Sequence, residues 1–401
     1  MRKILAVILS MVVVFTLAGG CGNKTEKKDN KDRAIIVGTN SESGGLDPAG
    51  VIADTYLAYS TVALDELLTY NSDGEIEYRA AESYEVNEEK TEWIFHLREG
   101  AKWSDGTPVT SADFRNTIER ALRPESGNGY SNYLFPIENA EDIYNGKADM
   151  STLGVITPDD RTLVFRLSVP CVYFLDLLRL PVYTPSCVTY ADSVGSGWDI
   201  NPETSVSNGP FYLAEYVPQQ YFVLKKNLHY WNADAISLEQ ITYKFFDNKQ
   251  SMAAAYATGE VDIAPGLLGT VVDEYEGKKD LVVTNAIATR YIYMNLDSVE
   301  VFRDVRVREA LNLGIDREEL CRMVGEDVEP TVNLVAKYMI DKSTGEYFVA
   351  GADAPFEENL TRAKELLAEA GYPDGKGFPT LTYSYPTLVF SNLVIPLAGR
   401  Y

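Results

Sequence analysis

Segments with the periodicity of β-strands alternate irregularly with segments of helical periodicity along most of the 401-residue chain. Ala34–Thr39 is a short apolar run typical of a buried strand. Glu92–Leu97 alternates in the manner of a strand, which places Trp93, Phe95 and Leu97 on one face and His96 on the other. This mixture of elements predicts an α/β fold.

Turn and capping residues divide the chain further. Pro218 begins a turn between two strand-like segments, Phe211–Val217 and Tyr221–Lys226, and indicates a hairpin at a sheet edge because proline cannot donate to a ladder. Residues 55–69 have helical spacing and end at the turn residues 71–74. Helix N-caps are predicted at Thr110, with Asp113 three residues later, and at Asp304, Asp316 and Asn359, with a C-terminal cap at Gly371.

The N-terminus has the pattern of an export signal. Two basic residues precede residues 4–18, an uncharged apolar segment of the length typical of a secretory signal peptide. Cys21 follows two glycines and resembles the acylated cysteine of a bacterial lipobox, although Ala18 stands where leucine is usual; a plain signal peptide with an incidental cysteine is the alternative. Residues 22–33 contain no apolar side chain, so a flexible tether is expected. The sequence predicts a signal peptide over 1–20, lipidation at Cys21 and attachment to the outer face of the cytoplasmic membrane.

The charge balance excludes one class of partner. The chain has 36 basic and 59 acidic side chains, a formal net charge of −23. Residues 1–33 carry seven basic and three acidic side chains, which leaves −27 on residues 34–401. Such a surface repels phosphate backbones, so no nucleic-acid partner is expected.

Signatures of catalysis and metal binding are missing from the sequence. It has two histidines and four cysteines without a Cys-x-x-Cys pair, and it contains no GxxxxGK[ST], HExxH or GxSxG motif. Carboxylates are too numerous for any glycosidase-like pair to be singled out. Cys171 and Cys187 are candidates for a disulfide in an exported protein. We therefore expect no enzyme, no metal and no cofactor, and disfavour an exported hydrolase.

Several motifs, in order, resemble those of the family 5 extracellular solute-binding proteins, the peptide receptors of ABC importers. The oligopeptide-binding branch is most similar, through YSNYL at 130–134 and IENA at 137–140. The other motifs are GLDP at 45–48, WSDGTPVTSADF at 103–114, SNGPFYL at 207–213, KKNLHYW at 225–231, ATGEVDI at 257–263, FRDVRVREALNLGIDREEL at 302–320 and AKELLAEAGYPDG at 363–375.

This resemblance implies a periplasmic-binding-protein-like fold of type II, class C, with mixed sheets in hinged lobes. Lobe I would comprise residues 34–78 and 202–298, lobe II residues 79–201, and lobe III residues 299–401. An oligopeptide would lie extended between the lobes, held by main-chain hydrogen bonds like an added strand, with its side chains in hydrated pockets. Hinge closure would present the loaded, monomeric receptor to the permease subunits of an ABC importer.

The positions of the family motifs also imply which residues line the cleft. Ile52 and Asp54 follow GLDP, where the first lobe contacts the peptide backbone. Tyr130 matches a lobe II tyrosine that covers the ligand. The remaining candidates lie at the crossover into lobe I or on its wall: Asn208, Gly209, Pro265, Gly266, Tyr291, Tyr293 and Asn295.

The C-terminal part departs from the family pattern. Residues 378–385 resemble the first strand of lobe III's own α/β unit, after which the family continues with a helix, more strands and a return into lobe I. Here Pro386 and Pro396 follow, at positions that a helix of about ten residues would not accept. We expect an incomplete lobe III, truncated before the family's carboxylate for the peptide amino group, and poor peptide binding. The alternatives are a receptor of this family for dipeptides, nickel or haem, and a non-functional truncated product.

Overall fold

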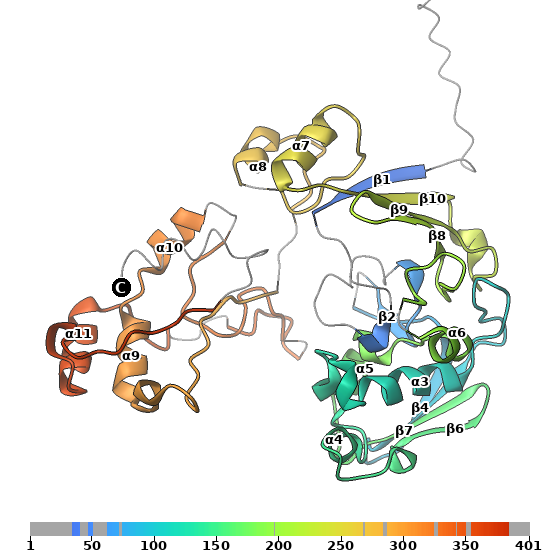
Figure 1. Cartoon of the computed structure of the whole chain (residues 1–401), viewed down its shortest axis with the longest axis horizontal. Helices are drawn as coiled ribbons and strands as arrows, with labels where there is room; N and C mark the ends of the chain where they lie inside the picture. The colour runs from blue at the N-terminus through green and yellow to red at the C-terminus, as the bar shows by residue number, and fades with distance from the viewer. Residues whose placement is uncertain are drawn as a thin grey trace, which may run out of the picture. The chain divides into compact units, whose positions relative to one another are not determined.

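The computed structural model describes residues 34–40, 47–50, 62–71, 74–195, 197–267, 269–283, 287–324, 328–341, 343–349 and 354–384. The chain divides into two compact units, Met1–Pro265 and Gly266–Tyr401. The predicted signal segment, Cys21, Ile52 and Asp54 lie outside the described residues. The predicted mixed α/β fold is confirmed (Figure 1).

One four-stranded sheet of the first unit joins distant parts of the chain. Its strand order is β1-β10-β9-β8, with β1 (Ala34–Thr39) parallel to β10 (Gln240–Phe245) and the other neighbours antiparallel. The predicted hairpin is confirmed as β8 (Phe211–Val217) and β9 (Tyr221–Lys226), and β8 occupies a sheet edge as its flanking proline requires. Apolar residues of these strands form a core of their own, in which the rings of Phe222 and Tyr243 stack with centroids 4.7 Å apart.

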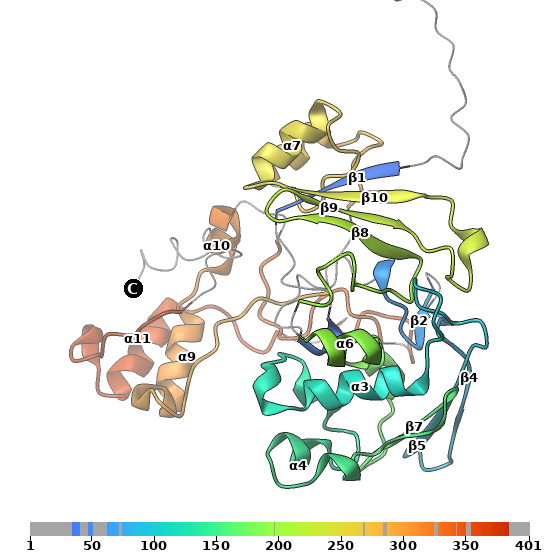
Figure 2. The ribbon, with the colours of Figure 1, turned by 45° about the vertical axis from the view of Figure 1, so that its right-hand side comes forward.

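A second sheet, of order β4-β5-β7-β6, is built from residues close in sequence and is antiparallel throughout. The apolar face predicted for β5 (Glu92–Leu97) is buried, and His96 lies on the opposite face within 3.3 Å of Glu85. Helix α3 (Ser111–Ala121) runs alongside this sheet, as Figures 1 and 2 show, and contributes Phe114 and Ile118 to the shared core.

The WSDGTPVTSADF motif forms the start of α3. Thr110 and Asp113 make the predicted capping box, with the Thr110 amide donating to the Asp113 carboxylate at 2.8 Å. The same carboxylate accepts from the indole nitrogen of the buried Trp103 at 3.4 Å and from the Val188 amide at 3.1 Å. The motif therefore fixes where the helix begins and what covers its first turn.

The helix expected over residues 55–69 is wrong at its C-terminal end. Leu68–Tyr70 is a strand, β2, which pairs antiparallel with β3 (Ile76–Tyr78). Asn71 closes this hairpin, because its side-chain oxygen accepts from the Glu75 amide at 2.9 Å. Adjacent leucines at 67 and 68 are fully buried, and such an apolar run has the same pattern in a buried helix and a buried strand.

The crossover between the two larger sheets is centred on Asp65, whose side chain is 4% exposed. The Asn208 side chain accepts from the Asp65 amide and donates to the Asp65 carbonyl, each at 2.9 Å. Trp231 donates its indole N–H to the Asp65 carboxylate at 2.9 Å. Burial raises the pKa of the Asp65 carboxyl to about 7, although the Trp231 hydrogen bond and the charge of Arg79 act in the opposite direction.

In the second unit, α9 (Val305–Leu313) and α11 (Leu360–Glu369) pack through alanine and leucine side chains. The N-caps predicted for α9, α10 (Arg317–Val324) and α11 are confirmed, since Asp304, Asp316 and Asn359 each accept a first-turn amide at 2.9 Å. Gly371 follows α11 with φ +99°, as expected of a residue past a helix end. The strand expected over 378–385 is not formed in its described part, residues 378–384, where no described strand supplies ladder bonds.

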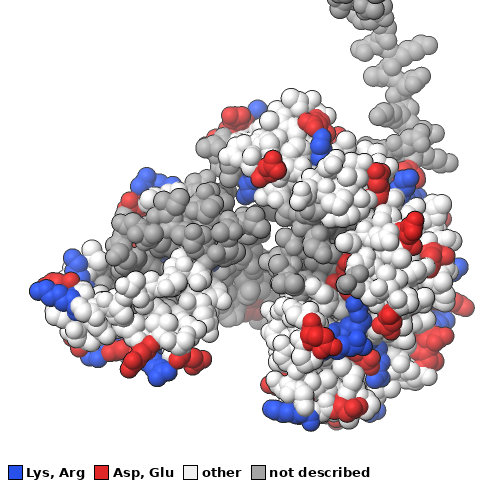
Figure 3. Space-filling view, viewed as in Figure 1, with Lys and Arg blue, Asp and Glu red and all other residues white. Residues whose placement is uncertain are grey.

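The remaining elements complete the first unit and begin the second. Within the described residues, no helix is long and apolar enough to cross a membrane, and Cys171, Cys187 and Cys321 are free thiols. On the face seen in Figure 3, acidic and basic side chains are interspersed.

The other strands and helices are β4 (Ala81–Val86), β6 (Val155–Asp159), β7 (Thr162–Arg166), α4 (Ala140–Tyr144), α5 (Phe174–Leu177), α6 (Val188–Val194), α7 (Lys249–Ala257) and α8 (Gly269–Tyr275).

Replacement of Asp65 tests whether burial raises the pKa of its carboxyl. Its folded pKa is raised, so between about pH 4 and 7 the folded state holds a proton that the unfolded state releases, and stability falls as pH rises. Asp65→Asn removes this titration and keeps an oxygen for Trp231. From pH 5 to pH 8 the free energy of unfolding of the wild type should fall by about 2–3 kcal/mol more than that of the variant.

Urea unfolding followed by tryptophan fluorescence measures this difference in the first unit, which contains all four tryptophans. Asp234→Asn, at an exposed site of the same unit, is the matched control and should follow the wild type. Parallel pH profiles for the wild type and Asp65→Asn would contradict the assignment.

Candidate ligand-binding site

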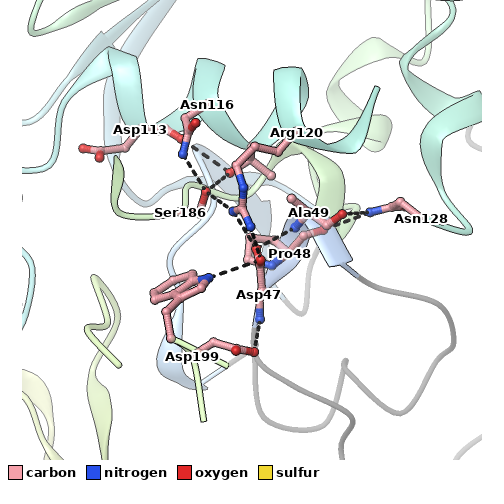
Figure 4. A network of polar contacts seen from close by, with 11 residues as sticks. Asp47, Pro48, Ala49, Asp113, Asn116, Arg120, Asn128, Ser186 and Asp199 are labelled. Atoms are coloured by element: carbon pink, nitrogen blue, oxygen red, sulfur yellow. Dashed lines mark hydrogen bonds and ion pairs between the residues drawn. The ribbon is translucent and has the colours of Figure 1, made fainter. Parts of the chain in front are cut away.

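A polar network surrounds the turn at residues 47–50, directly before the segment that contains Ile52 and Asp54 (Figure 4). We call it the Asp47 network. It joins the turn to α3, to the loop after α3 and to residues 186–199. Its members are Asp47, Pro48, Ala49, Asn116, Thr117, Arg120, Asn128, Ser186, Trp198 and Asp199.

The Asp47 carboxylate is the centre of this network. Both of its oxygens pair with the guanidinium of Arg120, one of them at 3.0 Å. Trp198 donates its indole N–H to the same carboxylate at 3.2 Å, and the main-chain N–H of Asp47 donates to Asp199 at 2.8 Å. Three residues from two parts of the chain, α3 and residues 198–199, therefore fix the position of one aspartate.

Ser186 extends the network along α3. Its hydroxyl oxygen lies 2.9 Å from the Thr117 hydroxyl and 3.3 Å from the Arg120 guanidinium. Ser186 is fully buried, so these contacts hold the Arg120 side chain in one orientation away from solvent.

Asn128 connects the turn to Tyr130. Its amide nitrogen donates to the carbonyls of Pro48 at 3.2 Å and Ala49 at 2.8 Å, and its side-chain oxygen accepts from the Tyr130 amide at 2.7 Å. Tyr130 is half-buried, with its ring centroid 6.0 Å from that of Tyr133. The structure thus brings one predicted ligand residue beside the turn that leads to two others.

Asn208 and Gly209 lie at the predicted crossover. Both ends of the Asn208 amide bind the Asp65 main chain, and Gly209 donates to the Ala63 carbonyl at 3.0 Å. A Cβ atom on Gly209 would lie 2.8 Å from the Ala63 carbonyl carbon, so only glycine permits this approach. These contacts stabilise the crossover, and a contact of either residue with a ligand stays a prediction.

The other candidates lie at the unit boundary and within the second unit. Pro265 and Gly266 are exposed, and Gly266 has φ +63°. Tyr291 and Tyr293 are 68% and 83% exposed. Asn295 binds the amides of Asp297 and Ser298 with its side-chain oxygen at 3.1 and 3.0 Å. Their roles in binding also stay predictions.

Sequence reasoning did not single out the residues that build the Asp47 network. Asp47 belongs to the GLDP motif, and Asn128 stands in a glycine-flanked turn two residues before Tyr130, so a search for capping and turn residues next to the candidates could have found both. Arg120, Trp198 and Asp199 carry no local signal, because their partner lies 73 to 152 residues away. Within the described residues, no group of three or more His, Cys, Asp or Glu side chains could hold a metal ion.

Comparison with known proteins identifies the family. Residues 75–391 match the model of the bacterial extracellular solute-binding proteins, family 5. The periplasmic oligopeptide-binding protein OppA of Salmonella typhimurium is 32% identical over 86% of this chain and 64% of its own length. A protein of Escherichia coli with the name "Probable deoxycholate-binding periplasmic protein YgiS" is 31% identical over 83% of this chain and 62% of its own length. The chain thus spans less than two thirds of the length of these relatives.

Solved structures agree with this result. A periplasmic oligopeptide-binding protein of Borrelia burgdorferi has a TM-score of 0.75 at 29% identity, covering 87% of this chain and 68% of that one. OppA of Listeria monocytogenes, bound to peptide, has a TM-score of 0.74 at 25% identity, covering 84% and 68%. The chain belongs to the family 5 bacterial extracellular solute-binding proteins, which are binding proteins and not enzymes.

Proposed function

We propose that this chain is an extracytoplasmic receptor that binds oligopeptides in a cleft between lobes and delivers them to an ABC permease. Lobe I would be formed by residues 34–78 and 202–298, lobe II by residues 79–201 and lobe III by residues 299–401. No catalytic step is required, since binding and release of the peptide are the whole of the chemistry.

The observation that carries the proposal is the pairing of the 47–50 turn with Tyr130 through Asn128. It ties the main chain of Tyr130, whose side chain is half-buried, to the turn that precedes Ile52 and Asp54. An extended peptide needs both kinds of partner: main-chain groups that continue its hydrogen-bonding pattern, and a flat apolar surface that accepts varied side chains.

The names of relatives support a peptide ligand. OppA of Haemophilus influenzae, 28% identical, has been solved in complex with RPPGFSPFR. The deoxycholate-binding relative favours a second candidate, an amphipathic organic anion. The strongly acidic composition argues for the peptide, because a carboxylate ligand would enter against the net charge of the protein.

A ligand screen separates these candidates. The purified protein is incubated with a mixed peptide pool, and bound material is identified by mass spectrometry after gel filtration. Retention of peptides of varied sequence supports the proposal. Deoxycholate binding measured by calorimetry, without peptide retention, would favour the second candidate.

Tyr130→Ala should weaken peptide binding. Truncation of a tyrosine that covers a bound ligand removes on the order of 2 kcal/mol, or about a 30-fold loss of affinity. Tyr144→Ala, at an exposed tyrosine of the same unit, is the matched control and should bind like the wild type. Isothermal titration calorimetry with one retained peptide measures both, and equal affinity of Tyr130→Ala and the control would remove Tyr130 from the cleft.

We also propose that Cys21 anchors the receptor to the outer face of the cytoplasmic membrane. Two or more acyl chains give stable anchoring, whereas one does not. Radiolabelled palmitate should therefore enter the wild type and be absent from Cys21→Ala. Equal labelling of the two proteins would remove Cys21 as the acylation site, and absence of label from both would leave a plain signal peptide.

A further inference from the structure

We propose that Asn128 is a positioning residue of the ligand site, whose side-chain amide locks the 47–50 turn and the Tyr130 main chain into one rigid unit. The inference rests on the function proposed above and adds to it the residue that couples the 47–50 turn to Tyr130. Asn128 itself need not touch the ligand.

Both the donor and the acceptor end of the Asn128 amide bind these two segments. Its two N–H groups have the Pro48 and Ala49 carbonyls as acceptors, and its oxygen accepts from the Tyr130 amide. The residue is 7% exposed, so water cannot replace a lost partner at low cost. An aspartate at this position would place a carboxylate oxygen against two carbonyl oxygens.

Asn128 is held in place by the C-terminal end of α3. Its main-chain N–H donates to the Ser126 hydroxyl oxygen at 3.3 Å, and its carbonyl oxygen lies 3.2 Å from the Ser131 hydroxyl oxygen. The Ser126 and Ser131 hydroxyls donate to the Ala121 carbonyl, at 3.1 and 2.7 Å. Asn128 is therefore positioned through Ser126 and Ser131, which bind the last residue of α3, Ala121.

The same end of the helix holds the turn at a second point, through Arg120 and Asp47. The ion pair fixes the position of the turn, and the hydrogen bonds from Asn128 to the Pro48 and Ala49 carbonyls fix its orientation. Of the two, the Asn128 attachment is the one that also binds the Tyr130 main chain. Loss of the Asn128 amide should therefore uncouple Tyr130 from the turn and leave the ion pair intact.

Two substitutions at Asn128 separate the effects of its three side-chain hydrogen bonds. Asn128→Asp removes the donors to Pro48 and Ala49 but keeps the acceptor for the Tyr130 amide, and Asn128→Ala removes all three. Asn139→Asp is the matched control: Asn139 also donates to one main-chain carbonyl, that of Thr152 at 2.8 Å, but it is less buried and its partner is not a member of the Asp47 network.

Amide hydrogen exchange gives a readout independent of any ligand. In Asn128→Asp, the Ala49 and Gly50 amides should exchange faster while the Tyr130 amide stays protected. In Asn128→Ala all three should exchange faster, and the control should match the wild type. Uniformly faster exchange across the first unit would show a merely structural role and overturn the inference.

Peptide affinity gives the second readout. Asn128→Asp and Asn128→Ala should each bind a retained peptide roughly tenfold more weakly than the wild type, as expected for loss of one oriented contact. In a Tyr130→Ala background the effect of Asn128→Ala should shrink, because the two residues act as a unit. Affinities equal to that of Asn139→Asp would overturn the inference.

The two proposals fail in different ways. A wild-type protein that binds no peptide contradicts the proposed function, and the exchange pattern then decides by itself whether Asn128 couples the turn to Tyr130.

Discussion

The ion pair between Asp47 and Arg120 is the interaction on which the candidate site depends. Both side chains are largely buried, at 15% and 17% exposure, so removal of either would leave a largely buried charge without its ionic partner. Trp198 and Asp199 complete the environment of Asp47. Because these contacts fix the turn against α3, the carbonyls of Pro48 and Ala49 stay within hydrogen-bonding distance of the Asn128 amide.

Features that depend on near neighbours could be predicted from the sequence. The capping box at Thr110 and Asp113 and the edge hairpin after Val217 follow from a few adjacent residues, and the structure confirms them. The family resemblance is equally well supported, because its motifs are themselves local segments. Tyr130 belongs to one of these motifs. The motifs contain no information, however, on the contacts that hold the 47–50 turn.

Features that depend on a pairing partner outside the segment itself were missed. Leu68–Tyr70 looks helical in isolation, and it is a strand because Ile76–Tyr78 pairs with it across the turn closed by Asn71. Asn208 binds the main chain of Asp65 across 143 residues, and no sequence pattern connects the two. Periodicity shows which side chains are apolar, whereas the choice of a partner depends on geometry that only the folded chain supplies.

The parallel pairing of β1 with β10 has a consequence for the order of folding. Ala34 is synthesised well before its ladder partner Gln240, so the first sheet cannot close until most of the first unit has been made. The β4–β7 sheet is made of antiparallel neighbours within residues 81–166 and can form sooner. β1 must therefore wait with an unpaired edge, a state in which chaperone binding protects a nascent chain from aggregation.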